Sequence, residues 1–238
     1  MGEVSTRHLS FLETGRAQPS REMVLHLAEQ LEVPLRDRNT LLTAAGFAPV
    51  YRERPLSDPD LRPALRAVDA IIDGHMPYPA LAIDRHWTLV AANPAVSRLL
   101  SGVASELLAP PVNVLRLALH PKGLAPKTLN YTAWRAHLLD RLHRQAAASA
   151  DPALLSLLSE LRGYPPPAGA QPARPSPDFG GMVIPFEFAS DAGTMSLLST
   201  TTVFGTPVDI TLSELAMECF YPADDATAAL LRQQAAAS

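Results

Sequence analysis

The hydrophobic and polar positions of segment 4–16 follow the period of a short helix with one apolar face. Leu9 and Leu12 are three residues apart and therefore share that face, whereas most positions around them are polar or charged. Ser5 is predicted to be the N-cap, because its hydroxyl can accept a hydrogen bond from a free backbone N–H of the first turn. Gly15 is predicted to end the helix in the left-handed conformation. The pattern therefore predicts a short helix held by two leucines, with its polar face left for other contacts.

Two more helices are predicted before the composition changes. A helix over 20–32 begins after the N-cap Ser20, and a helix over 35–45 ends at Gly46. Residues 48–59 lose the helical period and gain proline and charge, so a linker is predicted there. The apolar face of the helix over 20–32 is formed by Met23, Val24, Leu27, Ala28 and Leu31.

Beyond the linker, the apolar pattern predicts an amphipathic helix from Leu61 to Ile72, a β-hairpin, a helical middle and a β-rich end. The last three strands are rich in valine, phenylalanine, isoleucine and threonine, which suits an antiparallel meander packed on helices. A short helix is expected from Asp224. Strands are predicted over 80–84, 87–92, 182–189, 194–204 and 208–221, helices after the cap Asn93 and over 113–119, 132–148 and 152–161, and a loop over 163–181.

The composition limits the class of protein. The chain has 238 residues and a net charge of −4, so its overall charge gives no nucleic-acid signal. Cys219 is the single cysteine, which excludes a disulfide framework and favours a reducing compartment. No apolar run reaches the roughly 18 residues of a membrane span, and the N-terminus lacks the apolar stretch of a signal peptide. The expected location is the cytoplasm.

The sequence contains no arrangement of side chains typical of catalysis or of a metal centre. His137 and His143 lie six apart on one predicted helix, which places them on nearly opposite faces, and neither HExxH nor CxxC occurs. A GxSxG nucleophile elbow and a glycine-rich phosphate loop are also missing. We therefore expect no enzyme activity, no metal and no cofactor.

The first predicted helix resembles the recognition helix of XRE-type helix-turn-helix regulators of bacteria. In that family two further helices precede it, so the resemblance implies a chain shortened at its N-terminus, with residues 1–47 as a partial DNA-binding domain. The matched pattern is serine, three residues, leucine, serine, one residue, an apolar residue, glutamate, one residue, glycine and arginine, at Ser5, Leu9, Ser10, Leu12, Glu13, Gly15 and Arg16.

A recognition helix over Ser5–Thr14 would read the major groove of double-stranded DNA at an operator. Arg7 suits bidentate contact with guanine, and Phe11 could meet a thymine methyl group. Contacts to phosphates position such a helix without reading sequence. A single unit binds weakly, so a homodimer on a two-part site is expected. The candidate DNA contacts are Thr6 and Arg7 at base edges, Phe11 one turn on, and Ser10, Thr14 and Arg16 at phosphates.

The remainder, residues 60–238, resembles the ligand-binding domain of MmyB-like transcription regulators. The resemblance is carried by YPALAIDRHWTLVAANPA, ALHPKGL, NYTAWRAHLLDRL and TVFGTPVDITLSELAMECFYPAD. It implies an α+β chain in which a helix-turn-helix remnant precedes a PAS-like antiparallel sheet packed with helices. It also implies a pocket for an apolar, fatty-acid-like ligand.

From patterning alone, a solid core and a pocket are equally good readings of residues 61–231, and the resemblance favours the pocket. Asn93 suits a helix cap as well as a ligand contact, and Trp134 suits a core as well as a pocket wall. Asn130 and Tyr131 precede the helix over 132–148 and could meet a polar ligand head. The candidate ligand contacts are Asn93, Leu99, Leu115, Asn130, Tyr131, Trp134 and Leu138.

The leading hypothesis is a ligand-responsive, one-component transcription regulator. The alternative is a ligand-binding or dimerising module that has lost DNA binding through N-terminal truncation. An enzyme acting on an apolar metabolite is a third hypothesis, and no catalytic group supports it.

Overall fold

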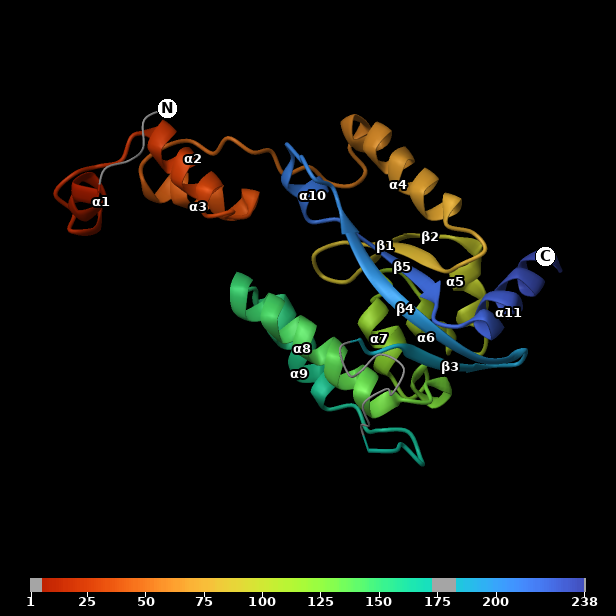
Figure 1. Ribbon diagram of the computed structural model, residues 1–238. Helices are drawn as coiled ribbons and strands as arrows, with labels where there is room; N and C mark the ends of the chain where they lie inside the picture. Colours follow the sequence, from red (N-terminus) through yellow and green to blue (C-terminus); the bar gives the residue numbers. More distant parts are fainter. Residues whose placement is uncertain (1–5, 173–182, 238) are drawn as a thin grey trace. The chain divides into compact units, whose positions relative to one another are not determined.

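The computed structural model describes residues 6–172 and 183–237 (Figure 1). The chain divides into two compact units. Unit 1 comprises the residues up to Leu61 together with Phe204–Glu214, and unit 2 comprises Arg62–Val203 and the residues from Leu215 onwards. Unit 1 is therefore built from two separate stretches of the chain.

Unit 1 contains the helices α1 (Thr6–Glu13), α2 (Arg21–Gln30) and α3 (Leu35–Ala44), and the short α10 (Ile210–Ser213). The three predicted N-terminal helices are confirmed. Ser20 caps α2, because its side chain accepts a hydrogen bond from the Met23 N–H. The predicted cap Ser5 lies outside the described residues.

Glycines end α1 and α3 as predicted. Gly15 has a φ of 68°, and the next amide, of Arg16, donates 2.8 Å back to the Phe11 carbonyl. Gly46 has a φ of 85° at the end of α3. Only a residue without Cβ takes these angles readily, which is why the helices end there.

The apolar face predicted for α2 is correct at Val24 and Ala28, which are buried, and wrong at Leu31, which is 74% exposed. The helix ends at Gln30, and Glu32 takes a φ of 51°. Because the chain turns there, Leu31 points away from the face that Val24 and Ala28 form.

Unit 2 is built around a five-stranded antiparallel sheet of order β2-β1-β5-β4-β3. The predicted hairpin is β1 (Ala80–Ile83) and β2 (Leu89–Ala92), and the predicted meander is β3 (Phe186–Ser190), β4 (Gly193–Val203) and β5 (Ala216–Pro222). Pairing of β1 with β5 joins the hairpin to the meander. The chain is thus α+β, as predicted.

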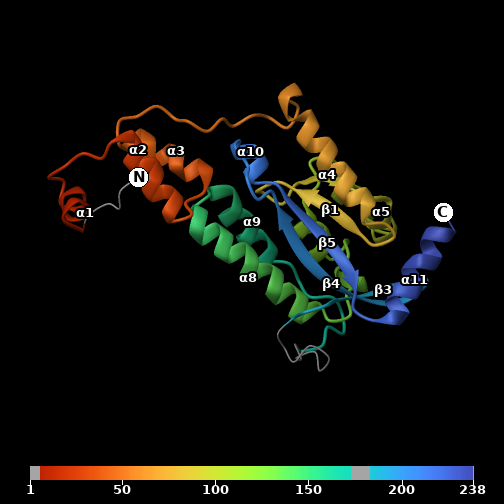
Figure 2. The same cartoon turned by 45° about the horizontal axis from the view of Figure 1, so that its top comes forward.

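Helices cover both sides of the sheet. The helix α4 lies on one side, while α8 and α9 pack on each other on the opposite side (Figures 1 and 2). Asp151 and Asp224 accept capping hydrogen bonds at the starts of α9 and α11, where the sequence predicts that helices begin. The helices of unit 2 are α4 (Arg62–Gly74), α5 (Pro94–Leu99), α6 (Ser105–Leu108), α7 (Val114–Leu119), α8 (Tyr131–Ser149), α9 (Pro152–Arg162) and α11 (Asp225–Ala236), with a one-turn 3₁₀ helix at Ala125–Lys127. A second 3₁₀ helix, Pro59–Leu61, ends the first stretch of unit 1.

The strand predicted over 208–221 is wrong in its first half. Residues 210–213 form α10 instead, and the strand begins at Ala216. Asp209 caps α10 by accepting a hydrogen bond from the Thr211 N–H, and Ile210 is buried within unit 1. Local capping and burial outside the sheet therefore outweigh the β-propensity of this stretch.

Candidate ligand-binding cavity

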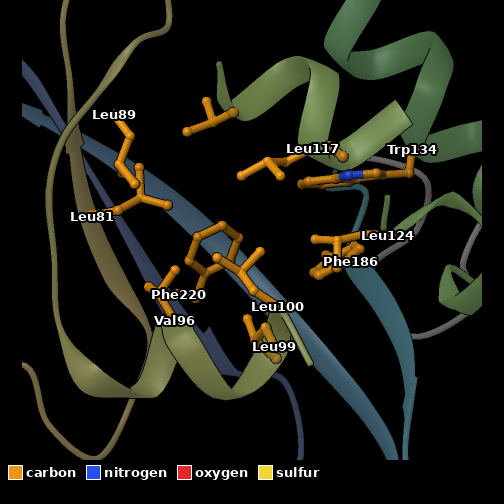
Figure 3. A pocket seen from close by; sticks show the side chains of 12 residues that line it. Leu81, Leu89, Val96, Leu99, Leu100, Leu117, Leu124, Trp134, Phe186 and Phe220 are labelled. Atoms are coloured by element: carbon orange, nitrogen blue, oxygen red, sulfur yellow. The ribbon is translucent and has the colours of Figure 1, made fainter. Parts of the chain in front are cut away.

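A cavity in unit 2 lies between one face of the sheet and three helices (Figure 3). Its sheet wall follows from strand alternation, because residues two apart on a strand point to the same face. Phe220 on β5 points into the cavity, and its neighbour Cys219 belongs to the opposite face, where it is buried. The sheet residues of the wall are Leu81, Leu89, Phe186 and Phe220.

The opposite wall is helical, and each helix contributes apolar residues at helical spacing. Leu99 on α5 and Leu100 just after it lie three and four residues beyond Val96, and the α7 residues follow the same rule. Trp134 from α8 closes one end (Figure 3). The complete helical and loop wall consists of Val96, Leu99, Leu100, Val114, Leu117, Ala118, Leu124 and Trp134.

The cavity has a volume of about 80 Å³ and exposes no polar atom. An apolar cavity of about 150 Å³ is known to stay dry and to take a benzene molecule. The cavity here is smaller, so it holds a short apolar group as it stands, and a longer chain must displace wall side chains. A charged or strongly polar group inside it would lose its hydration without compensation.

Trp134 links the cavity to polar groups behind it. Its indole packs on Phe186 inside the wall and stacks on His137, with ring centroids 5.5 Å apart. Burial, followed by the positive charges of Arg141 and Arg144, lowers the pKa of His137. His137 is therefore favoured in its neutral form beside the cavity wall.

A partly buried ion pair lies further along the same helix and strand. Arg141 on α8 donates to Glu218 on β5 at 2.5 Å, and Glu218 is 6% exposed. The Thr201 hydroxyl donates to the same carboxylate oxygen at 3.0 Å, and the guanidinium lies 4.6 Å from the centre of the Trp87 ring. Glu218 therefore has two partners, which is how a buried carboxylate is tolerated.

Two of the seven candidate ligand contacts, Leu99 and Trp134, line the cavity. Leu115 and Leu138 are buried in the surrounding core and do not line it. Asn93 is fully buried but is oriented elsewhere: its side chain donates to the carbonyls of Ile72 and Tyr78 and accepts from the Ala80 N–H. Although Asn93 occupies the N-cap position of α5, its side chain makes no capping bond. It ties α4 to β1.

The two predicted head-group contacts are also held by the fold and do not line the cavity. Asn130 donates to the Pro185 carbonyl at 2.7 Å and accepts from the Glu187 N–H, so it fixes the start of β3. Tyr131 is 2% exposed and donates to the Leu119 carbonyl, and burial raises its pKa.

The remaining wall residues were not predicted as contacts. Their apolar character was visible, since Leu81 and Phe220 lie in predicted strands and Val96 and Leu100 in a predicted helix. What the sequence does not give is which apolar side chains border an unfilled volume. That depends on packing between elements far apart in the chain.

The candidate DNA contacts lie on and just after α1. Thr6, Arg7, Ser10, Thr14 and Arg16 are exposed, and Phe11 is half-buried. The Arg7 guanidinium lies 5.4 Å from the Phe11 ring centre, one helical turn away. The Thr14 hydroxyl donates to the Ser10 carbonyl at 2.7 Å, which leaves its lone pairs free but uses its proton.

Among residues 6–172 and 183–237, no group of three or more histidine, cysteine, aspartate or glutamate side chains is placed to hold a metal ion. Within the same part of the chain, no helix combines the length and apolar character needed to cross a bilayer.

Comparison with known proteins identifies unit 2. The profile of the MmyB-like transcription regulator ligand-binding domain matches residues 64–233. The solved structure of an RNA-binding light-oxygen-voltage receptor aligns over 86% of this chain and 48% of its own, at 15% identity and a TM-score of 0.30. This chain thus spans about half the length of that receptor. Among curated proteins, no match was found.

Proposed function

The chain belongs to the family of MmyB-like transcription regulator ligand-binding domains, and on this basis we propose that it is a ligand-responsive, one-component transcription regulator. The observation that carries the proposal is the apolar cavity, all of whose wall residues lie within the matched stretch. A pocket enclosed by a family ligand-binding domain is the first place to seek its ligand.

The proposed ligand is a small apolar molecule of fatty-acid type. Each methylene moved from water into the cavity gains about 0.8 kcal/mol, and the wall offers only apolar contacts to it. The polar end of such a ligand must lie outside the cavity, since no polar atom lines it. The small present volume supports a mechanism in which the ligand displaces wall side chains such as Leu100 and Phe220 as it enters.

The proposed output is binding of double-stranded operator DNA through α1. Thr6 and Arg7 at its start would face base edges, Phe11 would meet a thymine methyl group, and Arg16 would contact a phosphate. The exposure of Arg7 and Arg16 supports this assignment, because groups that contact DNA must be free of the protein core. We expect a homodimer on a two-part site, because one short helix gives little affinity.

The proposal is tested with the purified chain, a random pool of duplex DNA, and dodecanoic acid as probe. Selection should enrich a two-part sequence, and adding the probe should change the affinity for it. If the probe binds and no sequence is enriched, the chain is a ligand-binding module and the proposed reading of DNA is wrong. If neither occurs, the whole proposal is wrong.

A further inference from the structure

The connection between β4 and β5, residues 204–214, leaves the sheet of unit 2 and belongs to unit 1. The last paired residues before and after it are Val203 on β4 and Ala216 on β5. Between these two residues the chain forms α10 and makes no pair with a strand of the sheet. We call residues 204–214 the connector.

Hydrogen bonds to backbone groups hold the connector to the segment that follows α3. The Ile210 N–H donates to the Arg52 carbonyl at 2.8 Å, and Arg52 and Asp209 form an isolated β-bridge. The Thr211 hydroxyl donates to the Arg54 carbonyl and accepts from the Arg54 N–H. The connector is therefore attached by one backbone–backbone hydrogen bond and by the side-chain hydroxyl of Thr211.

Charge pairs strengthen this attachment. Arg54 donates to Asp209 at 2.9 Å, and Asp209 is 1% exposed. The Arg36 guanidinium on α3 makes a bidentate contact with Glu214 of the connector, at 2.7 and 2.9 Å, and also donates to Glu53. These hydrogen bonds, those with Glu214 first, raise the pKa of Arg36, so it stays charged at any pH of interest. Arg36 thus joins α3 to the connector directly.

The C-terminal end of the connector, which carries Glu214, leads to the cavity wall within a few residues. Glu214 precedes β5 by two residues, and Phe220 on β5 lines the cavity. Along β5, residues 216–222 are all paired with β4, so the strand moves as one element. A ligand that displaces Phe220 acts on the strand that continues into the connector.

We propose that the connector transmits the state of the cavity to α3, through Asp209 with Arg54 and Glu214 with Arg36. The inference rests on the proposed function for its biological meaning, since it assumes that the cavity is the sensing site. Its physical content is a mechanical coupling between a wall strand and a helix of unit 1. Coupling between distant sites can be carried by a contiguous network of hydrogen bonds and packed elements, and the hydrogen bonds above form such a network from β5 to α3.

The test perturbs the cavity without a ligand and follows amide hydrogen exchange in the full chain. Ala118→Leu places three more carbons in the cavity, and Phe220→Ala removes most of one wall side chain. Each change should alter the exchange rates of α3 (Leu35–Ala44) by roughly two- to thirtyfold, the range expected for coupled sites. Circular dichroism at the same temperature identifies any variant that has merely unfolded.

The decisive comparison adds a second substitution to Ala118→Leu. Glu214→Gln removes a charge partner of Arg36 on the connector, whereas Glu53→Gln removes one on the segment after α3. The change in α3 exchange that Ala118→Leu causes should disappear when Glu214→Gln is also present and persist when Glu53→Gln is also present, each double variant being compared with its own single Glu→Gln variant. If both double variants respond alike, or if neither cavity substitution alters α3, the inference is overturned.

A separate arm adds dodecanoic acid to the unmodified chain. Failure of the probe to bind would count against the proposed ligand and would not affect the arms that use substitutions. Binding that leaves α3 exchange unchanged would instead overturn the coupling. The two proposals can therefore fail independently.

Discussion

The rings of Trp134 and Phe186 pack with their centroids 5.1 Å apart and their planes tilted by 31°. Trp134 comes from α8 and Phe186 from β3, so the pair joins the helical and sheet walls of the cavity. Aromatic pairs of this kind contribute about 0.5–1.5 kcal/mol beyond the area that they bury. A ligand that enters must therefore either separate these two rings or fit beside them while they stay in contact.

Trp134 should report ligand binding by its fluorescence. The chain has two tryptophans, of which only Trp134 lines the cavity. Trp87 is buried beside Arg141 and donates a hydrogen bond to Gln145. Titration with dodecanoic acid should change the emission of the unmodified chain and of Trp87→Phe. Trp134→Phe should lose the response while binding, followed by calorimetry, continues. A response that follows Trp87 instead would place the ligand elsewhere.

Affinity should depend on the length of the acyl chain. Each added methylene that enters should tighten binding about fourfold until the wall side chains can move no further, after which affinity falls. Leu117→Ala enlarges the cavity and should move the optimum to longer chains, at a stability cost of about 2–5 kcal/mol.

The matched control for that enlargement is Leu161→Ala, a buried leucine of α9 that does not line the cavity. It should cost similar stability and leave the optimum unchanged. The titration series consists of fatty acids of roughly eight to eighteen carbons, since their free energy of binding should grow in proportion to the number of buried methylenes. A flat response across the series would contradict an apolar site of limited volume.

Gly123→Ala should distort the helical wall. A Cβ at this position would lie 2.3 Å from the Leu117 carbonyl oxygen, and Leu117 lines the cavity. The backbone must move, so we expect a loss of about 1–3 kcal/mol and weaker ligand binding. Gly74→Ala on α4 is the control, since a Cβ there meets nothing within 4 Å. Urea unfolding distinguishes the two, and equal stability of both variants would show the close approach to be absent in solution.

The pair of Arg116 with Glu160 should make stability depend on acid pH. Hydrogen bonds from Arg116 lower the pKa of Glu160 from 4.5, so the ionised pair stabilises the fold above that value. The contribution is lost as the pH falls through the lowered pKa. Because both side chains are more than a third exposed, we expect only about 0.5–1 kcal/mol. Glu160→Gln should lose this amount at neutral pH and nothing in strong acid, as measured by urea unfolding.

Two arginines of unit 1 should affect DNA binding differently. Arg7→Ala should weaken binding to the selected site by about 1–3 kcal/mol and relax the preference at one base pair. Arg16→Ala should weaken all sequences equally and reduce the slope of affinity against salt. The measurement is fluorescence anisotropy with the selected duplex and a scrambled one. If Arg7→Ala changed both duplexes alike, the orientation assigned to α1 would be wrong.

Local signals in the sequence were sufficient for most helices and their ends. Ser20 accepts a capping hydrogen bond where the sequence predicts it, Asp151 and Asp224 accept such bonds at the predicted starts of α9 and α11, and Gly15 and Gly46 take positive φ. These features depend on neighbours within four residues, so the sequence contains the information directly.

Features set by distant contacts were not predictable. Residues 210–213 look like a strand, and they form a helix in a stretch that is held to unit 1 by contacts such as Asp209 with Arg54, 155 positions earlier in the chain. Asn93 looks like a cap, and its side chain instead bonds to α4 and β1. The cavity is a small volume that the side chains of the sheet and of the helices leave unfilled where they pack together. No local sequence pattern predicts whether the space between packed elements is completely filled.

The discontinuity of unit 1 limits how this protein can be dissected or recombined. A gene fragment ending at Leu61 would encode α1, α2 and α3 without the connector, so Arg36 would lose Glu214 and Arg54 would lose Asp209. A fragment starting at Arg62 would carry the apolar Ile210 with no surface to bury it. Swapping the N-terminal helices onto another sensor would therefore require exchanging two stretches of sequence together. In evolution the two stretches must likewise change in step, and the partners Arg54 and Asp209 are where paired substitutions should be sought.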